Sequence, residues 1–387
     1  MTNPDVPEIP SEKVTIGEES ALQWAVHDTL EQIYEFISRY LIIPTEEQRW
    51  AFTAWIYHCV VIEAFDSTPR LAVLSTEKRT GKTRMFEVAD LLLEHSMFTN
   101  SISQSSLFRS IHNNPQLVVL IDEGDTIWGP FKNALGEGLR GIVNSGHRRG
   151  VTVSRTEKSK EGMKTETFRT FCPVAINGIG NFLPDTIVDR SIVINMKRRT
   201  GEERVEAFRY RTAEQQVSPI RARMENERPH VIKAVDGYFP VMPVQDRSAD
   251  VWEPLVIIGD LAVGEWKGRI RKACVVMETN KNKQATSIGE CLLKDIWIIF
   301  DGKAVKKIFT KDLLKELNEL EESPWGDFQG SPLDERKLAK LLRPYEITPK
   351  QIRIGENSAK GYDYDDFWET WTRYTIVKTG VGWKLDE

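Results

Sequence analysis

A short apolar segment that runs into a lysine-containing loop and then into a helical pattern constrains the fold of this chain more than any other feature. Residues 71–75 read LAVLS, residues 76–83 read TEKRTGKT, and residues 84–95 read RMFEVADLLLEH. In this strand–loop–helix context the loop N–H groups and the helix N-terminus cradle phosphates. We expect the nucleotide contacts to be the consecutive residues Glu77, Lys78, Arg79, Thr80, Gly81, Lys82 and Thr83.

Two side chains of this loop have distinct expected roles. Lys82 would reach the β- and γ-phosphate oxygens, and the Thr83 hydroxyl would bind Mg²⁺. Thr76 stands where the pattern GxxxxGK[ST] has its first glycine, so the loop must start without the positive φ that glycine adopts at low cost. Taken alone, a chance GKT tripeptide in a turn is the alternative explanation.

A second apolar strand ends in two carboxylates. Residues 117–121 are continuously apolar and are followed by Asp122 and Glu123, which places both acids at the carboxyl edge of a buried parallel sheet. We expect Asp122 to hold the Mg²⁺ shell and Glu123 to orient and deprotonate an attacking water, a role that separates ATP hydrolysis from phosphoryl transfer to a hydroxyl. ATP and Mg²⁺ are therefore the expected cofactors, and a capped strand end is the alternative.

Two further polar residues are candidates for sensing the nucleotide. Asn177 ends the strand PVAIN, where its side chain would hydrogen-bond the γ-phosphate or the water; a turn-forming Asn before Gly178 is the simpler alternative. Arg247, near the start of a later predicted helix, is a candidate second sensor that would contact the nucleotide of its own chain.

Arg190 follows a short predicted helix and directly precedes the strand SIVIN. In AAA+ ATPases an arginine finger stands at this position and stabilises transition-state charge on a neighbouring subunit's nucleotide. A local ion pair with Asp185 or Asp189 is the alternative explanation.

A basic segment lies between the carboxylate strand and the strand that carries Asn177. VTVSR, a charged turn at 156–164 and TETFRTF predict an inserted hairpin. From 140 to 169, eight Lys and Arg residues stand against three acids, in a chain whose net charge is −5. Hairpin lysines would contact a nucleic-acid backbone in the pore of a ring, whereas a solvated surface hairpin is the alternative. The expected DNA contacts are Arg148, Arg149, Lys158, Lys160 and Lys164.

The last third of the chain predicts three helices and a hairpin. We expect the third helix, within SPLDERKLAKLLRPY, to begin with Ser331 as N-cap and Pro332 at its first position. The basic residues of this helix share a face away from the leucines, and QIRIGENSAKGYDY predicts a wing. Together these features favour a DNA-binding winged helix, although many winged helices bind protein instead. The expected contacts are Arg336, Lys340, Arg343 and Lys360.

Strands that alternate with helices predict an α/β fold with a parallel sheet. The expected segments are a flexible tail at 1–20, a helical segment at 21–69, a P-loop core at 70–200, a helical lid at 201–277, a polar linker at 278–287, the winged helix at 288–376 and a tail at 377–387.

Composition sets the expected environment. The chain has no apolar run long enough to span a membrane and no apolar leader, so we expect a cytoplasmic protein without a membrane partner. The cysteines lack metal-ligand spacing and are expected to be reduced core residues: Cys59, Cys172, Cys274 and Cys291.

Several longer strings support one resemblance, namely PRLAVLSTEKRTGKT, LIDEGD, GHRRG, INGIGNFLPDTIVDRSIVINMKRR, DRSADVWEPL and KGYDYDDFWETW. Together they resemble the helicase-like AAA+ ATPase domain of uncharacterised actinobacterial phage and plasmid proteins, a domain often joined to primase modules. The resemblance covers roughly residues 21 to 376. It implies a replication or mobile-element ATPase that acts on DNA in the host cytoplasm, with a separate primase or replication initiator as a partner.

The expected protein is therefore a homo-oligomer, a hexameric ring that works as a DNA helicase or translocase. A non-unwinding initiator, loader or switch ATPase would use the same residues and remains open. A monomeric P-loop kinase is the third possibility, and Glu123, Arg190 and the lid count against it.

Overall fold

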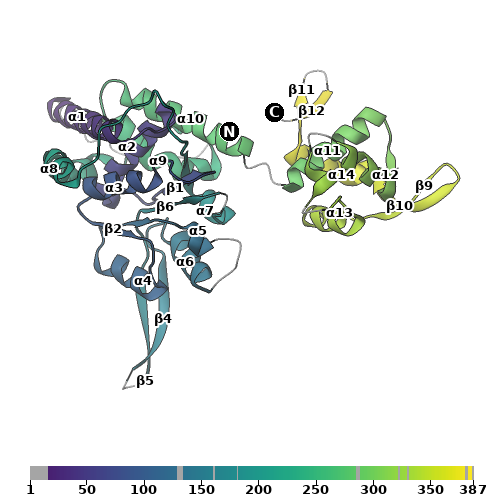
Figure 1. Ribbon diagram of the computed structural model, residues 1–387, viewed down its shortest axis with the longest axis horizontal. Helices are drawn as coiled ribbons and strands as arrows, with labels where there is room; N and C mark the ends of the chain where they lie inside the picture. Colours follow the sequence, from purple (N-terminus) through teal and green to yellow (C-terminus); the bar gives the residue numbers. More distant parts are fainter. Residues whose placement is uncertain are drawn as a thin grey trace, which may run out of the picture. The chain divides into compact units, whose positions relative to one another are not determined.

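The computed structural model describes residues 16–128, 134–159, 162–180, 182–284, 288–320, 323–328, 331–379 and 382–385. The chain divides into two compact units, Met1–Lys281 and Asn282–Glu387, and each is described by itself (Figure 1). In the described part of the chain no helix is long and apolar enough to cross a membrane. The four cysteines carry free thiols.

A five-stranded parallel sheet forms the centre of the first unit, in the order β2-β3-β6-β1-β7. Its strands are β1 (Arg70–Ser75), β2 (Ser96–Thr99), β3 (Val118–Ile121), β6 (Val174–Ile179) and β7 (Ser191–Asn195). Four of them are the predicted apolar runs. Strand β2 was not predicted because it lies at an edge of the sheet, is only partly buried and reads SMFT. The sheet confirms the predicted α/β core, in which helices flank a parallel sheet.

Alternate residues of the strands pack on opposite faces of the sheet, as the two-residue period of a strand requires. Leu71 and Val73 of β1 belong to one hydrophobic cluster, whereas Ala72 between them belongs to the other. The helices that connect the strands are α3 (Lys82–Leu92), α4 (Gln104–Asn113), α5 (Asp125–Trp128), α6 (Ala134–Ser145) and α7 (Asp185–Val188).

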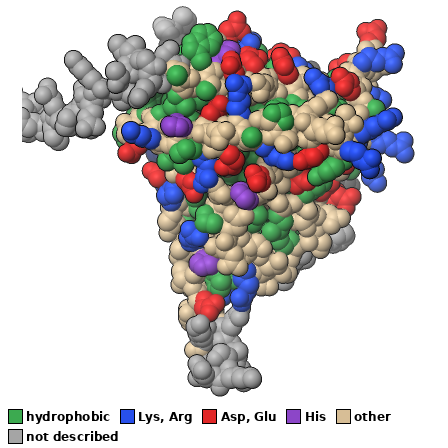
Figure 2. Space-filling view, turned by 90° about the vertical axis from the view of Figure 1, so that its left-hand side faces the viewer, with side chains coloured by type: hydrophobic (Ala, Val, Ile, Leu, Met, Phe, Trp, Pro, Cys, Tyr) green, Lys and Arg blue, Asp and Glu red, His purple; other side chains and the backbone are tan. Residues whose placement is uncertain are grey.

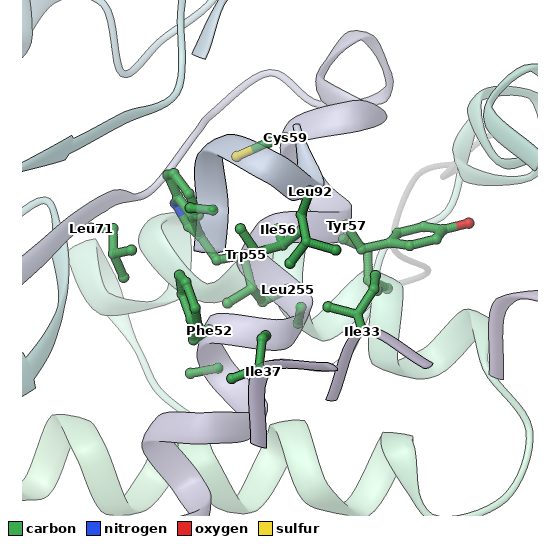
Figure 3. Packing of buried hydrophobic residues seen from close by; sticks show 14 of the residues in the cluster. Ile33, Ile37, Phe52, Trp55, Ile56, Tyr57, Cys59, Leu71, Leu92 and Leu255 are labelled. Atoms are coloured by element: carbon green, nitrogen blue, oxygen red, sulfur yellow. The ribbon is translucent and has the colours of Figure 1, made fainter. Parts of the chain in front are cut away.

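Helices from both ends of the first unit share one core with β1 and α3. They are α1 (Ile16–Tyr40), α2 (Glu46–Val60), the 3₁₀ turn η1 (Ile62–Ala64), α8 (Tyr210–Val235), α9 (Asp246–Leu261) and α10 (Trp266–Gln284). Figure 3 shows Phe52 and Trp55 of α2 beside Leu71 of β1 and Leu255 of α9. The segments expected as a helical prelude and a lid therefore pack on the same side of the sheet and on each other.

The boundaries of these helices test the sequence signals at their ends. Helix α2 begins at Glu46 with Thr45 as its N-cap, as predicted. Helix α1 already begins at Ile16, inside the expected tail. The expected linker at 278–287 is helical as far as Gln284, because the buried carboxylate of Glu278 accepts hydrogen bonds from Trp252 Nε1 at 2.9 Å and Ser248 Oγ at 2.7 Å. This contact with α9 holds a polar segment in the helix.

The inserted hairpin consists of β4 (Thr152–Ser159) and β5 (Gly162–Arg169) and extends away from the sheet beside α4 (Figure 1). The predicted turn at 156–164 is wrong, because β4 continues into this range as far as Ser159 and β5 begins within it at Gly162. Thr156 pairs with Thr165 across the strands, with 2.9 Å between the two hydroxyl oxygens. Such cross-strand pairs of β-branched residues favour an extended ladder over a turn.

The second unit contains α11 (Ile288–Lys303), β8 (Lys307–Phe309), α12 (Thr310–Glu319), η2 (Pro324–Asp327), α13 (Glu335–Leu342), η3 (Arg343–Tyr345), β9 (Lys350–Ile354), β10 (Asn357–Asp363), α14 (Tyr364–Tyr374), β11 (Ile376–Thr379) and β12 (Gly382–Leu385). Strands β8, β10 and β9 form an antiparallel sheet in that order. Helices α11, α12 and α13 and the β9–β10 hairpin are elements that the sequence predicts. Helix α14 was not predicted, and the β11–β12 hairpin extends into the expected tail at 377–387.

The N-cap predicted for α13 is wrong. Asp334, and not Ser331, caps the helix, because its Oδ1 accepts the Lys337 N–H at 2.8 Å. The preceding residue, Leu333, is held outside the helix because its N–H donates to Asn318 Oδ1 at 3.0 Å and to Trp325 O at 2.8 Å.

Candidate active site

The phosphate-loop segment joins β1 to α3 at the carboxyl edge of the sheet. Gly81 is the N-cap of α3 and has a φ of +89°, a conformation that favours glycine. Arg79 has a positive φ of 64°, which costs a non-glycine residue some strain. Thr76 has no positive φ, so the loop begins as expected without the first glycine of the pattern.

The Lys82 ammonium is held by neutral oxygens of the loop. Its Nζ donates to Ser75 Oγ at 2.5 Å and to Glu77 O at 3.4 Å. Burial lowers the pKa of Lys82, and the charges of Asp125 and Asp122 partly oppose that effect. The loop therefore holds a partly buried cation whose contacts are hydroxyl and carbonyl groups, and a phosphate would be a stronger partner.

The carboxylate pair and the sensor candidate meet where β3 and β6 end side by side. The Glu123 N–H lies 2.8 Å from Asp122 Oδ1 and 3.3 Å from Asn177 Oδ1. Glu123 is exposed and has a φ of +54°, so its backbone is strained at this point. Gly124 follows directly, and a Cβ there would lie only 2.6 Å from Ile176 Cγ2. The close packing leaves no space for a side chain at position 124.

Asn177 supplies the observation that tests whether a nucleotide fits. Its side chain is 1% exposed, and its Nδ2 is a buried donor without a hydrogen-bond partner in the described part of the chain. A buried donor without a partner calls for an explanation, and a bound phosphate or water would supply the missing acceptor. Lys82, the buried Asp122 and the exposed Thr83 at the start of α3 provide the groups that phosphate and Mg²⁺ require.

Arg190 lies at the opposite edge of the sheet from this site. Its carbonyl accepts the N–H of Arg70, the first residue of β1, at 2.9 Å, whereas the phosphate loop follows Ser75, the last residue of the strand. Five residues of strand span roughly 17 Å. Arg190 Nη1 donates to Thr186 O at 2.6 Å, and no ion pair of Arg190 occurs within the described ranges, so the local ion-pair explanation is wrong.

Arg247 also lies at this amino edge. Its Nη1 donates to Asp189 Oδ2 at 2.9 Å, and it lines the same cavity as Arg190. This placement contradicts the expectation that Arg247 contacts the nucleotide of its own chain. The physical reason is that α9 packs against β7 and α2, which brings its first turn to the amino end of β7.

The predicted DNA contacts of the hairpin region are only partly in reach of a ligand. Arg149 is not free, because its guanidinium donates to the carbonyls of Phe65, Glu63 and Ile62. That contact contradicts its assignment to DNA. Arg148 is exposed and pairs with Asp250 at 2.6 Å. The side chains of Lys158, Lys160 and Lys164 lie outside the described residues.

The basic residues predicted for the second unit are exposed. Arg336 and Lys340 of α13 and Arg343 of η3 point away from the core, whereas Leu338 and Leu342 are buried. Lys360 pairs with Gln351, the fourth of five residue pairs counted from the turn at Gly355 and Glu356, so it lies in the β9–β10 ladder and away from the tip of the hairpin. On the face shown in Figure 2, Lys and Arg side chains are interspersed with Asp and Glu.

Comparisons with known proteins place the chain in a family. A family described as "Protein of unknown function (DUF3631)" matches residues 195–374. The chain is 34% identical over 182 residues to the "Uncharacterized 28.9 kDa protein in xis 5'region" of Saccharopolyspora erythraea, and this match covers 46% of the chain and 68% of that protein. The chain belongs to the same family as this protein. Neither of these two descriptions names an activity.

The solved structures that are similar to this chain have low sequence identity to it. The apo structure of the NrS-1 C-terminal region is 15% identical, covers 88% of this chain and 74% of that chain, and has a TM-score of 0.40. The SCCmec type IV Cch active helicase is 12% identical, covers 88% and 70%, and has a TM-score of 0.40. The ORC2 protein of Aeropyrum pernix is 12% identical, covers 80% and 89%, and has a TM-score of 0.25.

Two residues near the phosphate loop were missed at the level of sequence. Arg198, which follows β7, pairs with Glu77 at 2.9 Å and donates to Lys78 O at 3.2 Å. Asp125 acts on the pKa of Lys82 and accepts the Ile179 N–H at 3.3 Å. Because β7 runs parallel to β1, residues that follow β7 must lie near the loop that follows β1, and this rule could have identified Arg198.

Proposed function

We propose that this chain is an ATP-hydrolysing AAA+ motor that acts on DNA, and that several copies assemble into a ring that works as a helicase or translocase. The observation that carries the proposal is the meeting of Lys82, Asp122, Glu123 and Asn177 at the carboxyl edge of one parallel sheet. Parallel α/β sheets bind ligands at this edge.

Each residue of the site has a separate task in hydrolysis. Lys82 exchanges its loop oxygens for phosphate oxygens and neutralises their charge. Asp122 and Thr83 would hold Mg²⁺, which offsets the charge on the β- and γ-phosphates when it is bound. Glu123 accepts the proton of the attacking water, and the free Nδ2 of Asn177 donates to that water or to the γ-phosphate.

Arg190 cannot serve the phosphate loop of its own sheet, because the length of β1 separates the two edges. In the proposed assembly it contacts the nucleotide of an adjacent copy. The β4–β5 hairpin and the exposed basic face of α13 are the surfaces that would contact DNA.

The test compares wild-type protein with Lys82→Ala, Glu123→Gln and Lys233→Ala. Lys233 is an exposed lysine of α8 and serves as a matched control. We expect Lys82→Ala to lose binding of a fluorescent ATP analogue, Glu123→Gln to bind it and fail to turn over, and Lys233→Ala to behave as wild type. Hydrolysis by Glu123→Gln at the wild-type rate would contradict the assignment of the base.

A second measurement separates a motor from a switch. ATPase rates with and without single-stranded and duplex DNA, followed by strand displacement on a forked substrate, test whether hydrolysis drives movement. DNA-stimulated hydrolysis with displacement supports the motor. Hydrolysis without displacement would favour an initiator, loader or switch ATPase instead.

A further inference from the structure

Three arginines converge at the amino edge of the sheet, and we refer to them as the arginine cluster: Arg148, Arg190 and Arg247. They line one cavity of about 310 Å³ together with His147 and Asp250. The three side chains come from separate elements, namely the segment before β4, the segment between α7 and β7, and the first turn of α9. The fold therefore gathers basic residues that are far apart in sequence.

The charges in this cavity are incompletely balanced. Arg148 pairs with Asp250 at 2.6 Å and Arg247 pairs with Asp189 at 2.9 Å. Arg190 has no carboxylate partner among the described residues, and its Nε is buried without a hydrogen-bond partner. Three guanidinium groups thus share two carboxylates, Asp250 and Asp189, and one buried donor has no acceptor in the described part of the chain.

Two groups at this cavity have pKa values that are lowered mainly by burial, with a further contribution from nearby arginines. Burial lowers the pKa of Arg190, and the charges of Arg247 and Arg148 lower it further, against the effect of Asp189. Burial, followed by smaller effects of nearby arginines, lowers the pKa of His147 to about 4. His147 is therefore neutral at physiological pH and adds no charge of its own.

We propose that the arginine cluster is a binding site for the polyphosphate of a nucleotide held by an adjacent copy of this chain, so that Arg148 and Arg247 contact it together with Arg190. This inference rests on the proposed ATPase function and extends it. The sequence connects Arg148 with DNA and Arg247 with the chain's own nucleotide, whereas the inference assigns both residues to the nucleotide of an adjacent copy.

A polyphosphate fits the chemistry of the cavity. Planar guanidinium groups pair with phosphate oxygens through two parallel hydrogen bonds each, and converging positive charges match an anion with several charged oxygens. Within the chain, Asp250 pairs with Arg148 and Asp189 pairs with Arg247. The side chains of both partners in each pair are more than half exposed, and exposed ion pairs contribute only about 0–1 kcal/mol. Exchange of a carboxylate for a phosphate therefore costs little.

The adjacent copy is the source of the phosphate because the chain's own loop is out of reach. The arginine cluster lies at the amino ends of β1 and β7, and the phosphate loop follows the carboxyl end of β1. A nucleotide bound by one copy can meet the arginine cluster only of another copy.

The test uses the full chain with Arg148→Gln, Arg247→Gln and Arg190→Gln, each alone and each mixed with Lys82→Ala. Arg211→Gln is the matched control, because Arg211 is an exposed arginine of α8 that does not line the cavity of the arginine cluster. We expect each variant of the arginine cluster to lower kcat at least tenfold, as loss of one contact to transition-state charge does. The Kd for ATP should change by less than about threefold, because each phosphate loop is intact.

Mixing identifies which copy each arginine serves. A Lys82→Ala subunit lacks a working phosphate loop but has an intact arginine cluster, whereas an Arg247→Gln subunit has an intact phosphate loop. Where the cluster of the first meets the loop of the second, the interface is complete, so activity should return in the mixture. If Arg247 served its own nucleotide, no interface would be complete and the mixture would stay inactive, which would overturn the proposal for that residue.

Asp250→Asn separates phosphate contact from a structural ion pair. We expect it to keep at least half of the wild-type kcat, whereas Arg148→Gln loses activity. Equal losses in both would overturn the proposal for Arg148. This inference would be overturned if Arg148→Gln and Arg247→Gln hydrolyse ATP at the wild-type rate while Lys82→Ala and Arg190→Gln are inactive. The proposed function would not be affected by that result. A wild-type protein without ATPase activity would refute the proposed function itself.

Discussion

Arg149 provides a direct comparison between a structural role and a role in DNA binding. Its Nε lies 3.0 Å from Phe65 O, and its Nη2 lies 2.8 Å from the same oxygen and 2.9 Å from Glu63 O. The guanidinium also lies over the ring of Phe171 at 4.9 Å. These contacts tie the root of the β4–β5 hairpin to the segment that follows α2. We predict that Arg149→Ala destabilises the first unit.

The magnitude follows from these contacts. A hydrogen bond that involves a charged group contributes about 1.5–3 kcal/mol, and a cation–π contact adds about 0.5–1 kcal/mol. The Arg149 side chain is 43% exposed, so water can replace part of the lost bonding, and the several bonds come from a single group. We therefore expect a loss of about 2–3 kcal/mol in the free energy of unfolding, which corresponds to a fall of roughly 4–12 °C in Tm.

Thermal and urea unfolding of Arg149→Ala beside Arg148→Ala measure this difference. Arg148 and Asp250 form an exposed pair, so Arg148→Ala should lose at most about 1 kcal/mol. DNA affinity of Arg149→Ala, measured well below its Tm, should equal that of wild type. Two results together would refute the reasoning: Arg149→Ala unfolds at the wild-type temperature, and the slope of its log DNA affinity against log salt concentration falls by about one.

The remaining predictions address three other parts of the chain. Asn177→Ala should lower kcat about 10²-fold with little change in ATP affinity, and steady-state kinetics with wild-type turnover would contradict the sensor role. Burial raises the pKa of Glu227 above its ordinary value of 4.5, so the folded state holds the proton more tightly and the free energy of unfolding falls as pH rises through the folded pKa. Glu227→Gln should flatten that dependence in urea unfolding between pH 4 and 8, and an unchanged slope would assign it to another group. Arg336→Ala with Lys340→Ala should weaken duplex binding and reduce the slope of log affinity against log salt by about two; an unchanged slope in a filter-binding titration would point to a protein-binding surface.

The sequence predicts those parts of the fold whose signal is local. Strands β1, β3, β6 and β7 are buried and read as continuous apolar runs, and the phosphate loop has its strand before it and its helix after it. Strand β2 escaped prediction because a short, half-buried edge strand has neither an apolar run nor clear alternation. The length of the hairpin strands escaped because charged residues in a ladder resemble a solvated turn.

Charged side chains were harder to place because their partners are distant in sequence. Nothing near Arg149 indicates that carbonyls of 62–65 would take up its donors, and nothing near Arg247 indicates Asp189. Each contact depends on how α2 and α9 pack on the sheet, which is set by the shared hydrophobic core. Motif position predicts the residues next to Lys82 and Glu123, whereas the tertiary fold decides what a surface arginine touches.

The positions of the two charged sites on one sheet also constrain how copies of the chain would meet. The phosphate loop follows the carboxyl end of β1, and the arginine cluster lies at the amino ends of β1 and β7. A contact that brings the arginine cluster of one copy to the loop of the next joins two different surfaces, so it is heterologous and continues until a ring closes or a filament extends. A copy at an open end would bind ATP without guanidinium contacts from a neighbour. Under the proposed function, turnover per subunit should therefore rise with assembly, because each added interface completes one more site.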